Sequence, residues 1–399
     1  MSSGISSSAP AGGGAAALLL GAALCGLDAG AIGYVLPAMR ADTGADPLQA
    51  SWLVSFYVAG TLVAIPLGGA AVRRYGGVPV FRLCAAISAI GALVALIAHD
   101  PLVIVAARLA QGVGQGPLMP VAAAIIAMHW PAERQGRLMG GISLAYGAFF
   151  LGGTILAPAL LAFGWRSTFG LAAVVSVAAL MMVRSHPATA AAHAPGVATR
   201  AVYFVPELAA IAALSLGTGM GQAVVIFFPT LAVQRLGVTP AAAAILMLPL
   251  VVGGVATTIA ITAMLDRLGA RTLLAVGALA TLAGILLASL APASRPGFLV
   301  AAGLLGIGIT GLCGGPLRYA AARAVAVSEQ GPAQSAVALF TNIGVLAGSM
   351  MLGMLGARGA DERAALELAM GAACIIMAVT FLPVAAIHAH VRKGETRAR

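Results

Sequence analysis

Charged side chains are scarce in this sequence. Only 9% of its 399 residues are Asp, Glu, Lys or Arg, whereas 61% are hydrophobic and the mean hydropathy is +1.02. A soluble domain carries roughly 25% charged residues because its surface must face water. So few charges cannot cover a water-facing surface of this size. The composition therefore excludes an ordinary soluble protein and predicts a chain embedded in lipid.

Groups that could carry redox, metal or hydrolytic chemistry are equally sparse. The cysteines lie singly inside apolar segments, which indicates small apolar fillers rather than disulfides or metal ligands: Cys25, Cys84, Cys313 and Cys374. The sequence has neither a Walker pattern nor an H-E-x-x-H pair. We therefore expect no enzymatic activity, no cofactor and no metal. The net charge of +10 is spread over the ends of apolar runs rather than gathered in a patch, so we expect no nucleic-acid partner.

The apolar runs are long enough to cross a bilayer as helices. Segments 273–291 and 368–387 are free of charge and lack the polar/apolar alternation of a barrel strand. The sequence thus predicts an all-α membrane protein with twelve transmembrane helices in two six-helix bundles. The predicted spans are 14–38, 51–72, 78–98, 102–128, 138–163, 168–183, 204–233, 240–264, 272–291, 297–317, 335–356 and 364–388.

The arginines predict the orientation. With both termini in the cytoplasm, fifteen basic residues fall on the cytoplasmic side and six on the other, as the positive-inside rule requires. We expect a monomer in the bacterial inner membrane, with no cleaved signal peptide. The predicted parts are a cytoplasmic N-terminal tail (1–13), a first bundle (14–184), a cytoplasmic linker (185–203), a second bundle (204–389) and a basic cytoplasmic tail (390–399).

The two halves repeat each other. Pro47 opens the second span and Pro240 opens the eighth, 193 residues later. At the same spacing, Arg74-Tyr75-Gly76 follows the second span and Arg267-Leu268-Gly269 follows the eighth. Six-helix repeats with a site between them near the midplane are the architecture of many secondary transporters. Shared Pro and Arg-Gly punctuation of any two membrane hairpins is the alternative explanation.

Three signatures in the chain resemble those of the major facilitator superfamily, and more narrowly its drug:proton antiporter branches. The first is the loop after the second span and its copy after the eighth: Gly69, Arg74, Gly76, Asp266, Arg267, Gly269 and Arg271. The second, Arg108-Leu109-Ala110-Gln111-Gly112-Val113-Gly114, matches the family's R-x-x-Q-G-x-G in the fourth span. The third is a reduced antiporter motif in the fifth span, which keeps Gly153 and Pro158 but has Ala157, Leu161 and Ala162 in place of glycines.

The resemblance implies a transporter that works by alternating access. The loop signatures imply a latch made by an Asp–Arg pair beside a helix end, although Arg73 occupies the acidic position of the first copy. The reduced motif in the fifth span leaves the direction of transport open.

The coupling candidates are Asp28 and Arg108. Asp28 is the only acidic residue well inside a predicted span, and Arg108 lies deep in the fourth. Charges at such depth face the bundle interior or a watery cavity and need a partner. We hypothesise that Asp28 binds the coupling proton and that Arg108 controls how readily it does so. A purely structural anchor, or an Arg108 that extends outward to the membrane interface, are the alternatives. The corresponding residues of the second half are Gly221 and Ala301, which predicts that the first half handles the proton.

Other polar and aromatic residues within the spans are candidates for the substrate cavity: Tyr34, Phe56, Tyr57, Gln111, Gln115, Tyr146, Gln222, Phe227, Phe340 and Asn342. The few midspan charges argue against a polyanionic substrate. The sequence therefore predicts a secondary transporter that exports small neutral or cationic organic compounds in exchange for protons. Proton-linked uptake of a nutrient or metabolite is the alternative.

Overall fold

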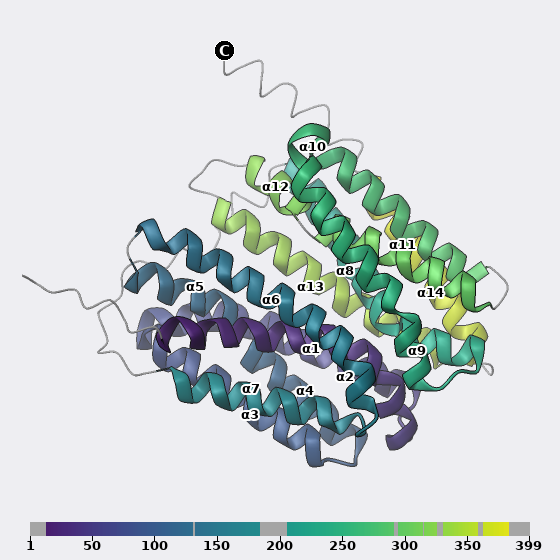
Figure 1. Cartoon of the computed structure of the whole chain (residues 1–399), viewed down its shortest axis with the longest axis horizontal. Coiled ribbons are helices and arrows are strands. Elements are labelled where there is room, and N and C mark those ends of the chain that lie inside the picture. The colour runs from purple at the N-terminus through teal and green to yellow at the C-terminus, as the bar shows by residue number, and fades with distance from the viewer. Residues whose placement is uncertain are drawn as a thin grey trace, which may run out of the picture. The chain divides into compact units, whose positions relative to one another are not determined.

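The chain folds into long helices. The computed structural model describes residues 13–130, 132–183, 206–290, 294–313, 315–324, 330–357 and 362–382 (Figure 1). The helices in this part of the chain are α1 (Gly13–Thr43), α2 (Pro47–Tyr75), α3 (Gly77–Ile97), α4 (Pro101–Gln115), α5 (Leu118–His129), α6 (Ala132–Leu161), α7 (Arg166–Met182), α8 (Pro206–Leu236), α9 (Pro240–Leu246), α10 (Leu248–Leu290), α11 (Arg295–Cys313), α12 (Gly315–Arg323), α13 (Gln330–Gly356) and α14 (Glu362–Phe381).

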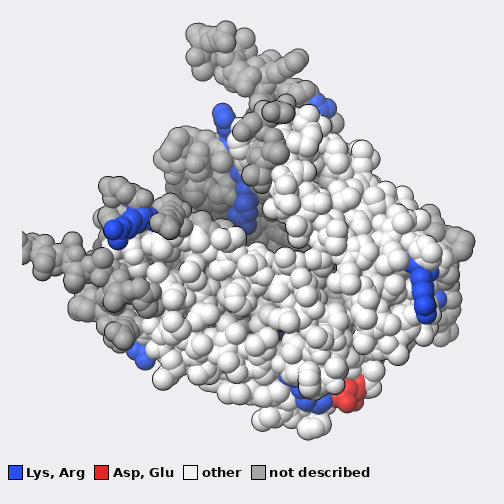
Figure 2. Space-filling model, viewed as in Figure 1, with Lys and Arg blue, Asp and Glu red and all other residues white. Residues whose placement is uncertain are grey.

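Each predicted span overlaps at least one of these helices, and residues 383–388 of the last span lie outside the described residues. Eleven helical segments of the described residues are long and apolar enough to cross a membrane, and the remaining predicted span is the shorter apolar helix Arg166–Met182. Large apolar side chains such as Ile97, Leu144 and Val252 are exposed on the helix surfaces, as lipid contact requires. The face drawn in Figure 2 is almost free of charged residues. The all-helical membrane fold is as predicted.

Several spans are less regular than the sequence predicted. The fourth span is broken into α4 and α5 at Gly116 and Pro117. Proline lacks the N–H that would continue the helix, which explains this break. The tenth span comprises α11 and α12, and residue 314 between them lies outside the described residues. The eighth span begins as the short α9, and α10 runs on into the ninth span through a non-helical Gly269.

Local capping hydrogen bonds stabilise the first turns of α2 and α9. Asp46 and Gln49 form a reciprocal capping box around the first turn of α2: the Asp46 carboxylate accepts from the Gln49 amide at 2.7 Å, and Gln49 Oε1 accepts from the Asp46 amide at 3.1 Å. In the second half, Thr239 caps α9 by accepting from the Ala242 amide. Each cap is followed by a proline at the first helical position, so the two prolines of the repeat have the same local role.

The backbone supports the internal repeat. Gly76 has φ 86° and ψ 160°, and Gly269, at the corresponding place in the second half, has φ 74° and ψ 157°. The loops one span earlier match in the same way, since φ is 66° at Gly44 and 63° at Gly237, again 193 residues apart. Residues with a Cβ avoid this region of the backbone map, so glycine is required there. The Arg-x-Gly signature therefore marks a turn with a defined conformation.

Contacts divide the chain into two compact units, each of which holds part of α1, α2 and α6. Unit 1 comprises residues 1–31, 59–156 and 163–194, and unit 2 comprises residues 32–58, 157–162 and 195–399. The second half of α1 and the first turns of α2 thus pack with helices of the C-terminal half. One such contact in unit 2 is the hydrogen bond between the hydroxyls of Ser55 and Ser349 at 2.7 Å. The predicted linker at 185–203 lies outside the described residues.

Each unit is packed through small residues. In unit 1, α3 runs beside α4 and α7 (Figure 1), and a Cβ at Gly114 would lie 2.5 Å from the Ser88 amide. In unit 2, α8 meets α13 so closely that a Cβ at Gly219 would collide with the Thr341 carbonyl oxygen. Such close approach of helix backbones is typical of packing in membranes, where no water drives the helices together.

Candidate functional site

Asp28 of α1 and Arg108 of α4 form a buried ion pair in unit 1. Nη1 of Arg108 donates to Oδ1 of Asp28 at 2.7 Å, and Nη2 donates to Oδ2 at 3.0 Å. Arg108 is 1% exposed and Asp28 is 8% exposed. Two parallel charge-assisted hydrogen bonds give a geometry that is both strong and directional. The alternative in which Arg108 extends outward to the membrane interface is therefore wrong.

Two further groups contact the Arg108 guanidinium. Nη1 also donates to Oε1 of Gln111, one helical turn along α4, at 3.0 Å. The guanidinium carbon lies 5.9 Å from the ring centroid of Phe169, which α7 supplies. The Nε2 atom of Gln111 is buried and has no hydrogen-bond partner among the described residues. The cation is thus surrounded by a carboxylate, an amide oxygen and an aromatic ring.

A second group of polar side chains surrounds Gln115, which lies two helical turns after Arg108 on α4. Nε2 of Gln115 donates to the Ser88 hydroxyl of α3 at 3.3 Å, and that hydroxyl lies 3.2 Å from the Ser176 hydroxyl of α7. Ser176 in turn donates to the Ala172 carbonyl, and all three polar side chains are buried. Sequence reasoning missed both serines, because nothing in their local sequence indicates that α3 and α7 meet at this point.

The corresponding place in the second half has no charge. A Cβ at Gly221, the counterpart of Asp28, would meet Cδ1 of Ile309 at 2.5 Å and Cε of Met377 at 2.9 Å. Ala301, the predicted counterpart of Arg108, is fully buried. Apolar side chains therefore fill this region of the second bundle. The second bundle thus packs at this place without an ion pair.

The predicted cavity residues are spread over several helices. Gln111 and Gln115 are buried inside unit 1 in the contacts just described. In unit 2, Nε2 of Gln222 donates to the Cys313 thiol at 2.8 Å, and Nδ2 of Asn342 donates to the Ala338 carbonyl of its own helix at 2.9 Å. The rest are buried or half-buried in their own helices: Tyr34, Phe56, Tyr57, Tyr146, Phe227 and Phe340. Their role in a cavity stays a prediction.

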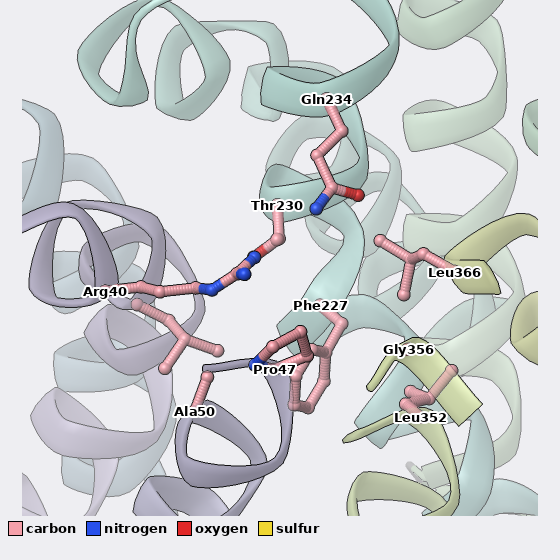
Figure 3. A pocket seen from close by; sticks show the side chains of 10 residues that line it. Arg40, Pro47, Ala50, Phe227, Thr230, Gln234, Leu352, Gly356 and Leu366 are labelled. Atoms are coloured by element: carbon pink, nitrogen blue, oxygen red, sulfur yellow. The ribbon is translucent and has the colours of Figure 1, made fainter. Parts of the chain in front are cut away.

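A pocket opens in unit 2 where α1, α2, α8, α13 and α14 meet (Figure 3). Its cavity volume is about 20 Å³, which is room for about one water molecule. Arg40, Thr230 and Gln234 point toward one another at one end, and the Thr230 hydroxyl is buried without a hydrogen-bond partner in the described structure. The rest of the lining is apolar or small and includes one of the predicted cavity residues: Leu36, Pro47, Ala50, Phe227, Leu352, Gly356 and Leu366.

The loop signatures are only partly described. Gly69 has open space around its Cα, and the Arg74 guanidinium lies 5.3 Å from the Tyr75 ring centroid. The side chains of Asp266 and Arg267 lie outside the described residues, so the predicted latch stays a prediction. Arg271 is half-buried. In α6, Pro158 lies inside the helix, and a Cβ at Gly153 would lie 2.5 Å from the Leu27 carbonyl oxygen of α1. Gly153 therefore lets α1 and α6 approach closely.

Arg235 differs from its predicted position in a loop. It lies in the last turn of α8, where Nε is 2.9 Å from the Glu367 carboxylate of α14 and Nη1 donates to the Ala288 carbonyl near the end of α10. One arginine thus joins three helices of unit 2. The predicted span 204–233 ended too early, because Gln234 and Arg235 were taken as the start of a loop.

Comparisons with known proteins identify the family. The profile described as "Major Facilitator Superfamily" matches residues 18–349. A multidrug resistance protein B homologue of Mycobacterium tuberculosis is 34% identical over 157 residues, which cover 37% of this chain and 28% of that protein. A putative metabolite transport protein of Haemophilus influenzae is 28% identical over 168 residues, which cover 42% and 41%. This chain thus spans less than half the length of each of these relatives.

Solved structures agree on the fold. The nucleoside transporter NupG, in a mutant form, superposes with a TM-score of 0.74 at 14% identity, covering 94% of this chain and 99% of that one. A D-xylose–proton symporter superposes with a TM-score of 0.72 at 16% identity, covering 92% and 96%. At this identity the likeness concerns the fold alone. Because the family profile matches most of its length, the chain belongs to the Major Facilitator Superfamily, whose members are transporters rather than enzymes.

Proposed function

We propose that this transporter exports small neutral or cationic organic compounds in exchange for protons, with Asp28 as the proton-binding group. The observation that carries the proposal is the buried bidentate pair between Asp28 and Arg108. A carboxylate deep in an apolar bundle is costly, and such groups in membrane proteins mark ion and proton paths. The apolar filling of the equivalent region in the second bundle supports a functional reason for the pair.

The chemistry of coupling follows from the charges. When Asp28 binds a proton, its negative charge disappears and both hydrogen bonds from Arg108 weaken. The contact between α1 and α4 is then looser, and release of the proton restores it. A helix contact that depends on protonation can link proton movement to a conformational change. In this proposal Asp28 is loaded from the outer side and releases its proton to the cytoplasm, while the substrate moves outward.

The substrate class rests on charge and on the relatives. Multidrug resistance and triacylglyceride transporters are among the proteins with similar sequences, which favours lipophilic compounds. We propose that the pocket beside Phe227 and Thr230 is part of the substrate path near its outer end. The chain would act as a monomer in the bacterial inner membrane with both termini in the cytoplasm, as the distribution of arginines favours.

Vesicles with an imposed pH gradient test the proposal. Wild-type protein and Asp28→Asn are reconstituted, and uptake of the lipophilic cations ethidium and tetraphenylphosphonium is followed into vesicles that are acidic inside. We expect gradient-driven accumulation with wild type and its loss with Asp28→Asn. Asp100→Asn is the matched control, because this acid caps α4 by accepting from the Leu102 amide and asparagine can do the same. Accumulation by Asp28→Asn equal to wild type would remove Asp28 from the mechanism.

Uptake of a nutrient or metabolite is the second candidate. The observation that favours it is the reduced motif of the fifth span, where Ala157, Leu161 and Ala162 replace the glycines of the antiporter signature. A pump-deficient host with and without the gene separates the two functions. Export predicts higher resistance to toxic cations and lower accumulation in cells. Unchanged resistance together with faster accumulation of a metabolite would favour uptake.

A further inference from the structure

Phe169 is an aromatic neighbour of the ion pair that the coupling scheme has not used. Its ring lies on α7 and is 2% exposed. The guanidinium carbon of Arg108 is 5.9 Å from the ring centroid. Cations are attracted to the face of an aromatic ring up to about 6 Å from its centroid. While Arg108 is paired with Asp28, it is thus at the outer limit of this attraction.

Other contacts hold the Phe169 ring in place. Its ring meets that of Trp165 edge-on, with centroids 5.8 Å apart and an interplanar angle of 89°. Trp165 carries the guanidinium of Arg166 at 4.2 Å from its centroid, and Nη2 of Arg166 donates to the Ala98 carbonyl at 3.0 Å. The Arg166–Trp165 contact is a close cation–aromatic contact of the kind that Arg108 and Phe169 do not yet make.

Protonation of Asp28 creates a problem for Arg108. Arginine stays charged at any physiological pH, and Arg108 is 1% exposed, so neutralising its partner leaves a buried cation. A buried charge that has lost its partner is strongly destabilising. Two groups still contact it: Oε1 of Gln111, at 3.0 Å, and the Phe169 ring. Without such contacts, proton binding to Asp28 would be opposed by the whole free-energy cost of a buried guanidinium that has lost its carboxylate.

We propose that Phe169 is the alternate partner of Arg108: the face of the Phe169 ring holds the guanidinium while Asp28 carries the proton. The guanidinium moves closer to the ring when the carboxylate is neutralised and returns when the proton leaves. Phe169 is thereby a positioning residue, which acts on the proton site through Arg108. This inference rests on the proposed role of Asp28 as the proton site.

Other titratable and charged groups of the same unit do not offer this role. The thiol of Cys25 lies one turn before Asp28 on α1, the Cys84 thiol and the Tyr146 phenol belong to α3 and α6, and the Arg166 guanidinium contacts the Trp165 ring. Thiols and phenols carry no charge near neutral pH in their ordinary state. Phe169 is therefore the group whose replacement should change the balance between the two positions of Arg108.

Infrared titration measures this balance without knowledge of the substrate. The carbonyl-stretch band of a protonated carboxylic acid is recorded against pH for the purified full chain, and the Asp28 band is identified by its loss in Asp28→Asn. The ring stabilises the cation more in the protonated state, so removing it makes proton binding less favourable. For Phe169→Leu we expect the midpoint to move to lower pH by about half to one unit. Phe169→Trp, which offers a stronger cation-binding face, should move it upward.

Controls make the outcome specific. Phe81 is a buried aromatic residue of the same unit that packs against Gly21, so Phe81→Leu removes a ring from the bundle without touching Arg108 and should leave the midpoint unchanged. Incorporation of fluorinated phenylalanines at position 169 keeps the shape of the ring while weakening its negative face. The midpoint should then fall stepwise with each fluorine, even if Phe169→Leu folds poorly.

Two results separate the two proposals. A Phe169→Leu midpoint equal to wild type, with no trend in the fluorinated series, would overturn the role of Phe169 and leave Asp28 as the proton site. The absence of any titrating band that disappears in Asp28→Asn would instead overturn the proposed proton site, and the role of Phe169 with it.

Discussion

Substitutions of Asp28 and Arg108 should change the free energy of unfolding non-additively. The loss in the double variant should be smaller than the sum of the losses in the two single variants. Asp28→Leu leaves the Arg108 guanidinium buried without its carboxylate. Breaking a buried pair in this way costs about 3–5 kcal/mol. Gln111 and Phe169 still contact the cation, so we expect a value near the lower end. The double variant Asp28→Leu/Arg108→Met replaces both charges by apolar groups and should lie within about 1 kcal/mol of wild type or above it.

The two single variants should also differ in their response to pH. In Arg108→Met the buried carboxylate can neutralise itself by binding a proton, so its loss of stability should shrink as the pH falls. In Asp28→Leu the guanidinium stays charged at every accessible pH, so its loss of stability should persist. The free energy of unfolding is measured in mixed micelles of dodecyl sulfate and dodecyl maltoside by circular dichroism at several pH values. Asp100→Asn, at the exposed start of α4, serves as the control.

Two outcomes would contradict this reasoning. If Asp28→Leu unfolds at the same detergent fraction as wild type, the pair does not contribute a buried charge interaction. If the double variant is destabilised by the sum of the single losses, the two residues act independently and the bidentate contact has no energetic consequence. Either result would also weaken the case for Asp28 as a coupling group.

Three further predictions concern the scaffold. Gly76→Ala forces a side chain into a backbone region open mainly to glycine and should lower the free energy of unfolding by about 1–3 kcal/mol in the same assay. Its control is Gly69→Ala, which has open space around it and should be neutral or slightly stabilising. Gly219→Ala puts a methyl group against the backbone of α13 and should lower the melting temperature by thermal denaturation. Arg235→Leu removes both the carboxylate and the carbonyl contacts of that arginine and should destabilise more than Glu367→Gln, because Glu367 is partly exposed; equal losses would contradict the bridging role.

The sequence indicated the helices because helix formation in a membrane depends on local properties. Length and apolarity placed all twelve spans, and glycine and proline marked their ends. The turns at Gly76 and Gly269 could also be predicted from the sequence, since glycine readily adopts a positive φ. The break after Gln115 was missed, because Gly-Pro inside an apolar run can belong to a helix or interrupt it, depending on its neighbours.

The sequence predicted only part of the candidate site. A lone acid in one span and a lone arginine in another predicted a pair, since each buried charge needs a partner and the described spans offer few others. The same reasoning assigned Gln111 and Gln115 to a substrate cavity, which stays a prediction; the structure shows both buried inside unit 1. A glutamine within a span satisfies its hydrogen bonds in either setting, so composition does not distinguish them.

The sequence was enough to show that this chain lies in lipid, to indicate a repeat at a spacing of 193 residues, and to place Asp28 and Arg108 within apolar spans, because each of these follows from residue chemistry and order along the chain. The groups that surround the pair and Gln115 became evident only in the folded chain. Phe169, Ser88 and Ser176 come from helices far away in sequence, and their contacts with α4 depend on how α3 and α7 are rotated and packed. Those rotations result from many weak steric contacts between small residues, and no single stretch of sequence encodes them.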